Sequence, residues 1–202
     1  MANNELTEIV CVIDRSGSMD VIKKDAIGGF NAFLAEQKKI PLPAYLTLTL
    51  FNHNYEIIHG GRNLQEVQPL TEQSYIPAGT TALLDAIGRT IDDVGKRLAS
   101  MREDQRPGKV LFVILTDGLE NASKDYKKDK IGEMIKHQQE KYGWRFEFLA
   151  ANMDAFAEAS ALHIPTSNAI NFQARDGELQ VVYKNLSSRS ASYRTTDTTL
   201  KR

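Results

Sequence analysis

The chain has 202 residues, 42% of them hydrophobic, and its 25 basic and 26 acidic side chains leave a formal net charge of −1. This balance gives no electrostatic case for nucleic-acid binding, and no apolar stretch approaches the roughly 20 residues that span a bilayer. Cys11 is the only cysteine, which excludes an intramolecular disulfide. We therefore expect a cytoplasmic monomer with no membrane or nucleic-acid partner, long enough to bury its core without disulfides.

The first predicted element is an apolar run of strand length at residues 8–14, and it ends in a carboxylate. Asp14 is followed at every second position by a hydroxyl, Ser16 and then Ser18, in a turn that contains Gly17. These side chains offer only oxygen, which suits Mg²⁺, Mn²⁺ or Ca²⁺ and suits zinc poorly. One carboxylate cannot hold such an ion alone, so further oxygen ligands are expected downstream.

Strand-length apolar runs alternate along the chain with stretches of helical period. One stretch has Leu84, Ile87, Ile91, Val94 and Leu98 at spacings of three and four, which places them on one helix face. The predicted strands are residues 8–14, 45–51, 55–59, 109–116, 145–151 and 169–172, and the predicted helices are residues 20–38, 84–98, 125–142, 154–162 and 175–193.

This alternation predicts an α/β protein with a mostly parallel sheet and helices on both faces. The strands at 45–51 and 55–59 are too close for a crossover helix, so they predict a hairpin through His53 and Asn54. One antiparallel edge strand follows from that hairpin.

Ligands of such open sheets gather at the carboxyl ends of the strands, and two more segments of this chain have suitable oxygens there. Gly79-Thr80-Thr81 leads directly into the clearest helix, and the buried strand at 109–116 ends in Asp117-Gly118. If these loops meet the first motif, two carboxylates and several hydroxyls surround one point. Two roles are open for Glu120 and Asn121: holding a metal-bound water, or shaping the turn.

The three motifs together resemble the von Willebrand factor type A family, which includes integrin inserted domains and many bacterial and phage intracellular proteins. The family's metal-ion-dependent adhesion site combines Asp-x-Ser-x-Ser, a separate threonine and a separate aspartate. Asp14, Ser16, Ser18, Thr81 and Asp117 stand at these positions, in the family's order. Thr80 replaces a glycine of the family's pattern, which leaves the choice between Thr80 and Thr81 open.

The resemblance implies a three-layer Rossmann-like fold in one domain, with a core at about 6–172, a last helix at about 175–193 and a frayed tail at 195–202. It also implies a bound Mg²⁺ or Mn²⁺ and a partner protein whose Asp or Glu carboxylate completes the metal's shell. Arg15, at the variable position of the motif, would favour an acidic ligand if it points outward.

Two other interpretations compete with this one. Asp14 and Asp117 could simply cap the helices that follow them. The same aspartates could instead serve a metal-dependent phosphotransferase or hydrolase. An aspartate-nucleophile phosphatase normally has a second acid two residues after the first, where this chain has Ser16, and the chain lacks a phosphate-binding loop and a nucleophile elbow. The sequence therefore favours a binding protein over an enzyme.

Overall fold

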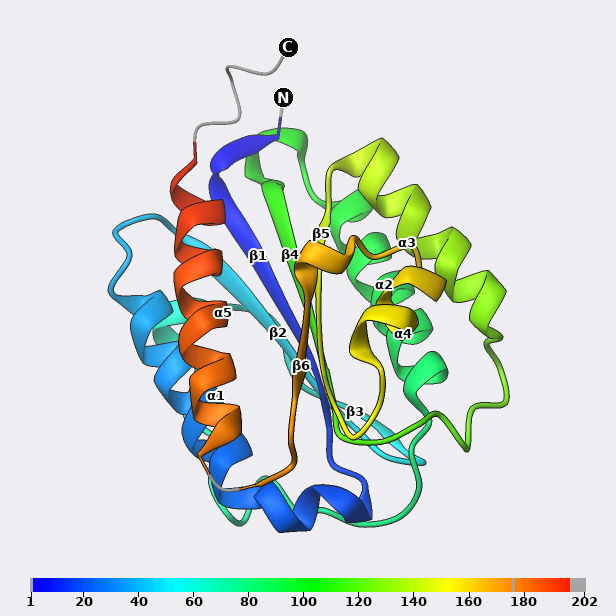
Figure 1. Ribbon diagram of the computed structural model, residues 1–202. Coiled ribbons are helices and arrows are strands. Elements are labelled where there is room, and N and C mark those ends of the chain that lie inside the picture. Colours follow the sequence, from blue (N-terminus) through cyan, green and yellow to red (C-terminus); the bar gives the residue numbers. More distant parts are fainter. Residues whose placement is uncertain (1, 176, 197–202) are drawn as a thin grey trace.

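The computed structural model describes residues 2–175 and 177–196 and has three layers, with a central sheet between two layers of helices (Figure 1). The strand order is β3-β2-β1-β4-β5-β6, and every neighbouring pair is parallel except β2 and β3. The strands are β1 (Asn3–Asp14), β2 (Ala44–Phe51), β3 (Tyr55–Asn63), β4 (Pro107–Thr116), β5 (Arg145–Ala151) and β6 (Ala169–Phe172). This confirms the mostly parallel sheet and its antiparallel edge strand.

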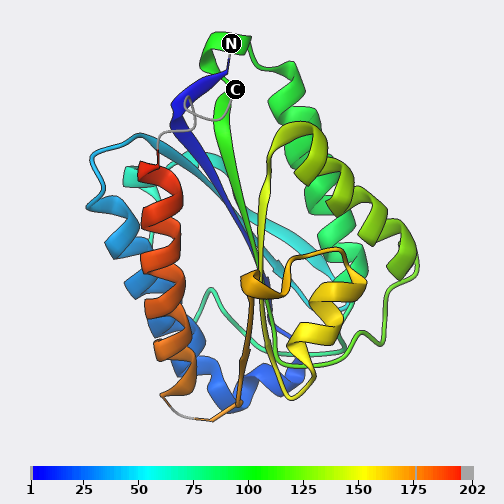
Figure 2. The same ribbon diagram turned by 45° about the horizontal axis from the view of Figure 1, so that its top comes forward.

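Two helices cover one face of the sheet and three cover the other, as Figures 1 and 2 show. The first pair is α1 (Lys23–Lys38) and α5 (Glu178–Thr195), and the opposite layer holds α2 (Leu83–Ser100), α3 (Lys128–Tyr142) and α4 (Ala155–Ala161). No helix in the described part of the chain is long and apolar enough to cross a membrane.

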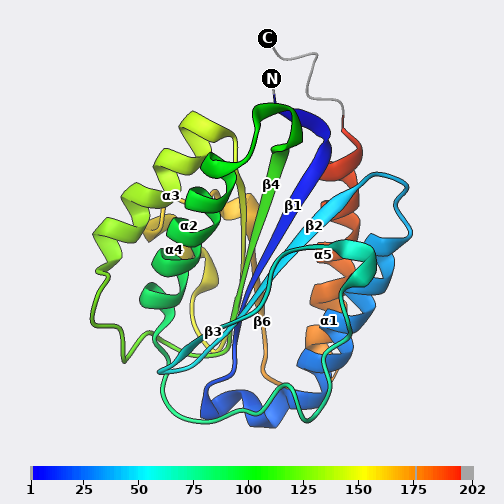
Figure 3. The same ribbon diagram turned by 180° about the vertical axis from the view of Figure 1, so that it is seen from behind.

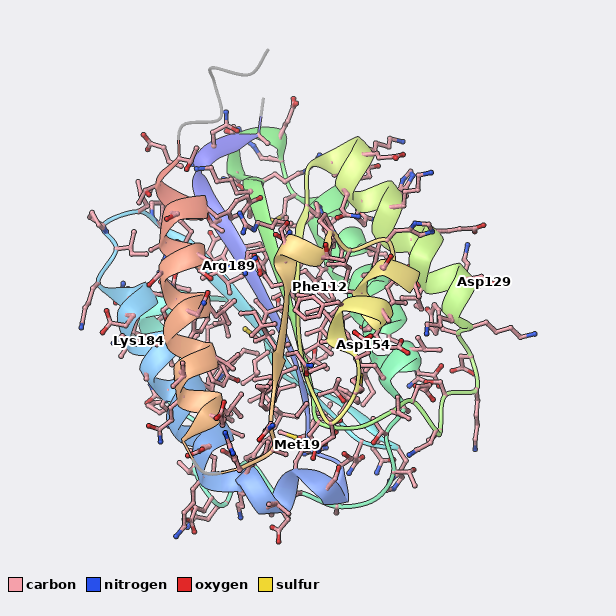
Figure 4. All side chains as sticks on the ribbon, in the orientation of Figure 1. Met19, Phe112, Asp129, Asp154, Lys184 and Arg189 are labelled. Carbon is pink, nitrogen blue, oxygen red and sulfur yellow. The ribbon has the colours of Figure 1, made fainter. Side chains whose placement is uncertain are left out.

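The alternation of side chains along the central strand explains the two cores. On β1, Ile9, Cys11 and Ile13 belong to the hydrophobic cluster under α1 and α5. Val10 and Val12 belong to the cluster under α2, α3 and α4. Because successive residues of a strand point to opposite faces, a continuous apolar run is required when both faces are covered. In Figure 4, Phe112 of β4 lies on the side of that second helix layer.

The predicted helix at 20–38 was wrong at its start. A 3₁₀ helix, η1 (Gly17–Ile22), precedes α1, which begins at Lys23. Met19 and Ile22 are both buried, and a spacing of three places side chains on the same side of a 3₁₀ helix. The burial of these two residues therefore favours the tighter helix at this point.

Other boundaries also differ from the predictions, and β3, for example, extends to Asn63 rather than residue 59. β1 begins at Asn3 rather than residue 8, because the polar start of the strand pairs with β4 across an irregular register. Asp85 binds the backbone of residues 124–126 in a loop, so α3 begins at Lys128 rather than residue 125. The last helix begins at Glu178 and includes Thr195, which was expected in the frayed tail; residues 197–202 lie outside the described part.

A buried arginine near the end of α5 joins this helix to the end of α1 and the segment that follows it. Arg194 is fully buried and donates to the backbone carbonyls of Gln37 at 2.8 Å and Leu42 at 2.7 Å. Burial lowers the pKa of its guanidinium to about 10. Removal of the side chain would take these hydrogen bonds from both carbonyls, of which Gln37 O would keep the Ile40 N–H at 3.4 Å.

We therefore expect Arg194→Ala to lower the free energy of unfolding by about 3 kcal/mol, because it removes buried hydrogen bonds to backbone carbonyls and opens a cavity. Lys184→Ala, at an exposed position of the same helix (Figure 4), should change it by less than about 0.5 kcal/mol. Urea unfolding measures both values. Equal stability of the two variants would show that Arg194 does not hold α5.

Candidate metal centre

The proposed ligands lie on three loops at one edge of the sheet. η1 follows the end of β1, the segment between β3 and α2 passes beside it, and the loop after β4 reaches the same edge (Figure 3). Gly17 N donates to Gly79 O at 3.0 Å, and Ala78 N donates to Arg15 O at 2.9 Å. The parallel pairing of β1 with β4 places Ile13 opposite Leu115, so Asp14 and Asp117 end neighbouring strands.

The serines connect the two aspartates through their hydroxyls. Ser18 Oγ donates to Asp117 Oδ1 at 2.7 Å and lies 3.2 Å from Ser16 Oγ. Ser16 N donates to Asp14 Oδ1 at 2.6 Å. Asp14, Ser16 and Asp117 are buried, whereas Ser18 is exposed. The oxygens therefore form a cluster that is open to solvent on the Ser18 side.

The structure distinguishes the two threonines. Thr81 is buried and Thr80 is exposed. A Cβ built on Gly118 would lie 3.8 Å from Ser18 Oγ and 3.9 Å from Thr81 Oγ1, so both hydroxyls border the same point beside the Asp117 loop. Geometry thus places the Thr81 hydroxyl with the other oxygens.

Asn121 holds Thr81 in place from the neighbouring loop. Its side-chain oxygen accepts from Thr81 N at 2.9 Å, and its own N–H donates to Thr81 O at 3.1 Å. Glu120 accepts from the backbone N–H groups of Leu84, Ala122 and Ser123. Both side chains therefore shape the loops, which is one of the two roles that the sequence left open for them.

Gly79 is required where the threonine loop approaches the first motif. Its φ of +75° is a conformation that L side chains rarely adopt, and a Cβ at this position would collide with the ring of His53. This glycine allows the backbone to approach Gly17 closely. It thereby brings the threonine segment beside the serines.

Burial raises the pKa of both carboxyls. The pKa of Asp14 rises to about 6, mainly because the group is buried and also because Asp117 is near, although hydrogen bonds from Thr116 and Ser16 oppose the increase. Burial raises the pKa of Asp117 as well, and the hydrogen bond from Ser18 opposes it. Two like charges in one buried cluster destabilise each other unless a cation lies between them.

One carboxylate oxygen of the cluster has no partner. Asp117 Oδ2 is buried and accepts no hydrogen bond from any described residue. A buried polar atom without a partner is costly, and a divalent cation would satisfy it. In the described residues no three His, Cys, Asp or Glu side chains gather as metal ligands, so a metal here would depend on the hydroxyls of Ser16, Ser18 and Thr81.

The sequence did not reveal two residues that support Asp14. Thr116 Oγ1 donates to Asp14 Oδ2 at 2.7 Å, and the Tyr75 hydroxyl donates to the Asp14 carbonyl oxygen. Thr116 is the polar residue at the end of the apolar run before Asp117. Its position opposite Asp14 in the parallel pairing of the two strands could have identified it. Tyr75 lies alone in a long loop, where no pattern indicates its role.

Arg15 does not point freely outward, which was the condition under which it would favour an acidic ligand. Its guanidinium lies 2.7 Å from a carboxylate oxygen of Glu56 on β3, and only 16% of the side chain is exposed. Its charge is therefore paired with a carboxylate of the same chain. The attraction of this edge for an anion must come from another source.

Comparison with solved structures assigns the fold. The von Willebrand factor domain of the type V pilus tip protein Mfa5 from Porphyromonas gingivalis has a TM-score of 0.66 at 10% identity, over 95% of this chain and 97% of that chain. A von Willebrand factor type A protein from Catenulispora acidiphila has a TM-score of 0.60 at 14% identity, over 95% and 43%.

A third similar structure carries a metal in the corresponding kind of motif. Proximal thread matrix protein 1 from the mussel byssus, with a zinc-occupied MIDAS motif, has a TM-score of 0.63 at 11% identity, over 92% of this chain and 48% of that chain. The chain thus spans less than half of the mussel and Catenulispora proteins. No protein-family model and no curated protein matches the sequence. The chain has the three-layer, Rossmann-like fold of von Willebrand factor type A domains.

Proposed function

We propose that this chain is a protein-binding module that holds a divalent cation with Asp14, Ser16, Ser18, Thr81 and Asp117. The observation that carries the proposal is the buried, unpartnered Oδ2 of Asp117, which lies in a cluster with a second buried carboxyl. The alternative in which both aspartates only satisfy backbone donors agrees with the bond from Ser16 N to Asp14 Oδ1, but it does not account for the buried, unpartnered Oδ2 of Asp117. The 3₁₀ helix after Asp14 has Ser16 at its N-cap and no side-chain cap hydrogen bond.

The donor set favours Mg²⁺ or Mn²⁺, with Ca²⁺ as a further candidate, because every donor is an oxygen. Asp14 and Asp117 would balance a divalent charge, and the hydroxyls are neutral. A bound cation would supply an electrophilic position on the exposed Ser18 side of the cluster. An Asp or Glu carboxylate from a partner protein is the matching ligand. The zinc of the mussel protein makes Zn²⁺ a useful competitor in binding experiments.

The residues of the candidate centre support a binding role over an enzymatic one, because Ser16 stands where an aspartate-nucleophile phosphatase normally has its second acid. A hollow of about 460 Å³ at the ends of β5 and β6 borders the centre, since its lining residue Asn152 donates to Asp117 O at 3.2 Å. None of the described residues that line this hollow is an acid or a histidine that could serve as a general base. We propose that the chain is not an enzyme, and that Mg²⁺ produces no turnover of a generic phosphoester such as p-nitrophenyl phosphate.

Pilus and byssus proteins are among the structural neighbours, so they lend no support to the cytoplasmic location expected from the sequence.

The first prediction concerns the charge of Asp14. Its folded pKa of about 6 exceeds the ordinary value of 3.8, so ionisation opposes folding. This cost in folding free energy is absent below pH 3.8 and grows as the pH rises from 3.8 to about 6. Above pH 6 it reaches about 3 kcal/mol. Metal-free Asp14→Asn should therefore be more stable than the wild type at pH 7.5, with little difference near pH 4.

Thermal unfolding in chelator at several pH values measures this difference, and titration calorimetry with Mn²⁺ measures the loss of metal binding expected in the same variant. Asparagine fits the site because the Thr116 hydroxyl can accept from its amide and donate to Gly118 O, 3.1 Å away. A variant that is less stable than the metal-free wild type, or that binds Mn²⁺ equally well, would contradict the assignment.

The second prediction concerns the threonines. Thr81→Val should weaken Mn²⁺ binding by about tenfold or more, because the buried hydroxyl beside Ser18 would be lost. Thr80→Val removes an exposed hydroxyl from the adjacent position and is the matched control. Titration calorimetry on both variants measures their Mn²⁺ affinities. A greater loss of affinity in Thr80→Val than in Thr81→Val would identify Thr80 as the metal ligand.

The third prediction concerns the partner. A protein that is captured on the immobilised chain in Mg²⁺ should be released by chelator, and one Asp→Asn or Glu→Gln change in it should abolish capture. Asp117→Asn in this chain should have the same effect. A partner that binds equally with and without metal must use another face of the domain.

A further inference from the structure

Each loop that supplies a proposed metal ligand also exposes one large apolar side chain. Val21 lies three residues after Ser18 and is 71% exposed; Ile76 lies five residues before Thr81 and is 59% exposed; Leu119 lies two residues after Asp117 and is 61% exposed. We call these three residues the apolar rim. The other exposed large hydrophobic side chains of the described residues lie on separate elements: Ile57 on β3, Tyr142 on α3, Phe156 on α4 and Val181 on α5.

The local structure explains why the rim residue on η1 faces solvent. Met19 and Ile22 are buried and anchor the 3₁₀ helix to the core. Because a 3₁₀ helix repeats every three residues, Val21 cannot share their direction. Figure 4 shows Met19 at this end of the molecule, below the ends of the strands. The exposure of Val21 is therefore set by the burial of its neighbours.

Contacts with the candidate metal centre hold the backbone on both sides of the other two rim residues. Tyr75 and Ala78, which flank Ile76, bond to the backbone oxygens of Asp14 and Arg15. Leu119 lies between Gly118, which borders the Ser18 and Thr81 hydroxyls, and residue 121, which bonds to Thr81. These contacts fix the backbone beside the candidate metal centre. Ile76 and Leu119 therefore lie within two residues of backbone that is bonded to the loops of the candidate centre.

Charges at this edge restrict the kind of partner. The Arg15 guanidinium is paired with Glu56, so it does not attract a second acid. Asp20 is exposed on η1, next to Val21, and its negative charge disfavours carboxylates beside the one that reaches the metal. Exposed apolar side chains gathered around a polar centre are typical of protein-binding surfaces.

We propose that the partner is a protein segment that presents a single Asp or Glu flanked by apolar side chains, and that these apolar side chains pack on Val21, Ile76 and Leu119. This proposal rests on the metal-dependent function above and adds the identity of the partner surface. The metal would bind the carboxylate of the partner, and the apolar rim would contact the apolar side chains on either side of that carboxylate. Burial of each rim side chain should strengthen binding by about tenfold.

The test uses a library of random disulfide-constrained peptides displayed on phage. Selection is performed on the immobilised chain in Mg²⁺, and bound phage are eluted with EDTA. We expect the eluted sequences to share one acidic residue with apolar residues on either side. One such peptide, made synthetically, is then titrated against the wild type and the Val21→Ser, Ile76→Ser and Leu119→Ser variants.

Each rim variant should bind the peptide about tenfold more weakly while its Mn²⁺ affinity, measured by calorimetry, stays unchanged. Val181→Ser is the matched control, since this side chain is 67% exposed on α5, and it should bind like the wild type. All four positions are exposed, so the variants should fold normally.

Three other outcomes overturn the proposal, and they distinguish the apolar rim from the metal-dependent function. EDTA-eluted peptides that share an acid but have random neighbours, or rim variants that bind like the wild type, would reject the role of the apolar rim and keep the metal-dependent function. Failure to elute any acidic peptide with EDTA would reject both.

Discussion

Two buried carboxyls at the ends of neighbouring parallel strands are the constraint on which this edge of the molecule depends. Asp14 ends β1, and the pairing of Ile13 with Leu115 places it opposite Thr116, the last residue of β4, so that Asp117 follows one residue beyond that strand. Neither group can be hydrated freely, so the surrounding loops supply hydrogen bonds from Ser16, Ser18 and Thr116. These bonds compensate the charge only in part, because both pKa values stay raised.

The remainder of the fold offsets this local cost. Both faces of β1 are covered by hydrophobic clusters. The other buried acids on the sheet are paired: Glu8 with Arg97 at 2.7 Å, and Glu147 with Arg145 at 2.7 Å and with Arg189 at 2.9 Å. The contrast is informative. Glu8 and Glu147 each have an arginine beside them, whereas among the described residues no ion pair joins an arginine to Asp14 or Asp117.

Much of the fold follows from the sequence because strand and helix periods differ strongly. All six strands, the hairpin at His53 and Asn54, and the five helices occur where apolar spacing predicts them. The boundaries were less predictable. The start of α1 depends on the burial of Met19 and Ile22, and the start of α3 depends on hydrogen bonds to Asp85, which is 39 to 41 residues away from its partners.

The candidate site was likewise predictable only in part from the sequence. Its five oxygen side chains stand in recognisable motifs, and the structure brings their loops together. The supporting contacts join residues far apart in the chain. Tyr75 reaches the Asp14 backbone across 61 positions, and Asn121 reaches Thr81 across 40. The pairing of Arg15 with Glu56 is equally remote, so its neutralised charge could not be foreseen from the first motif alone.

The most direct test of the central claim is a crystal structure of the chain grown with Mn²⁺, with anomalous diffraction data collected to locate the ion. The account predicts one strong anomalous peak within the oxygen cluster, in contact with the Ser16, Ser18 and Asp117 side chains. That peak should disappear in Asp14→Asn crystals grown under the same conditions. A map without a peak between Asp14 and Asp117, or with manganese bound only elsewhere on the molecule, would contradict the account.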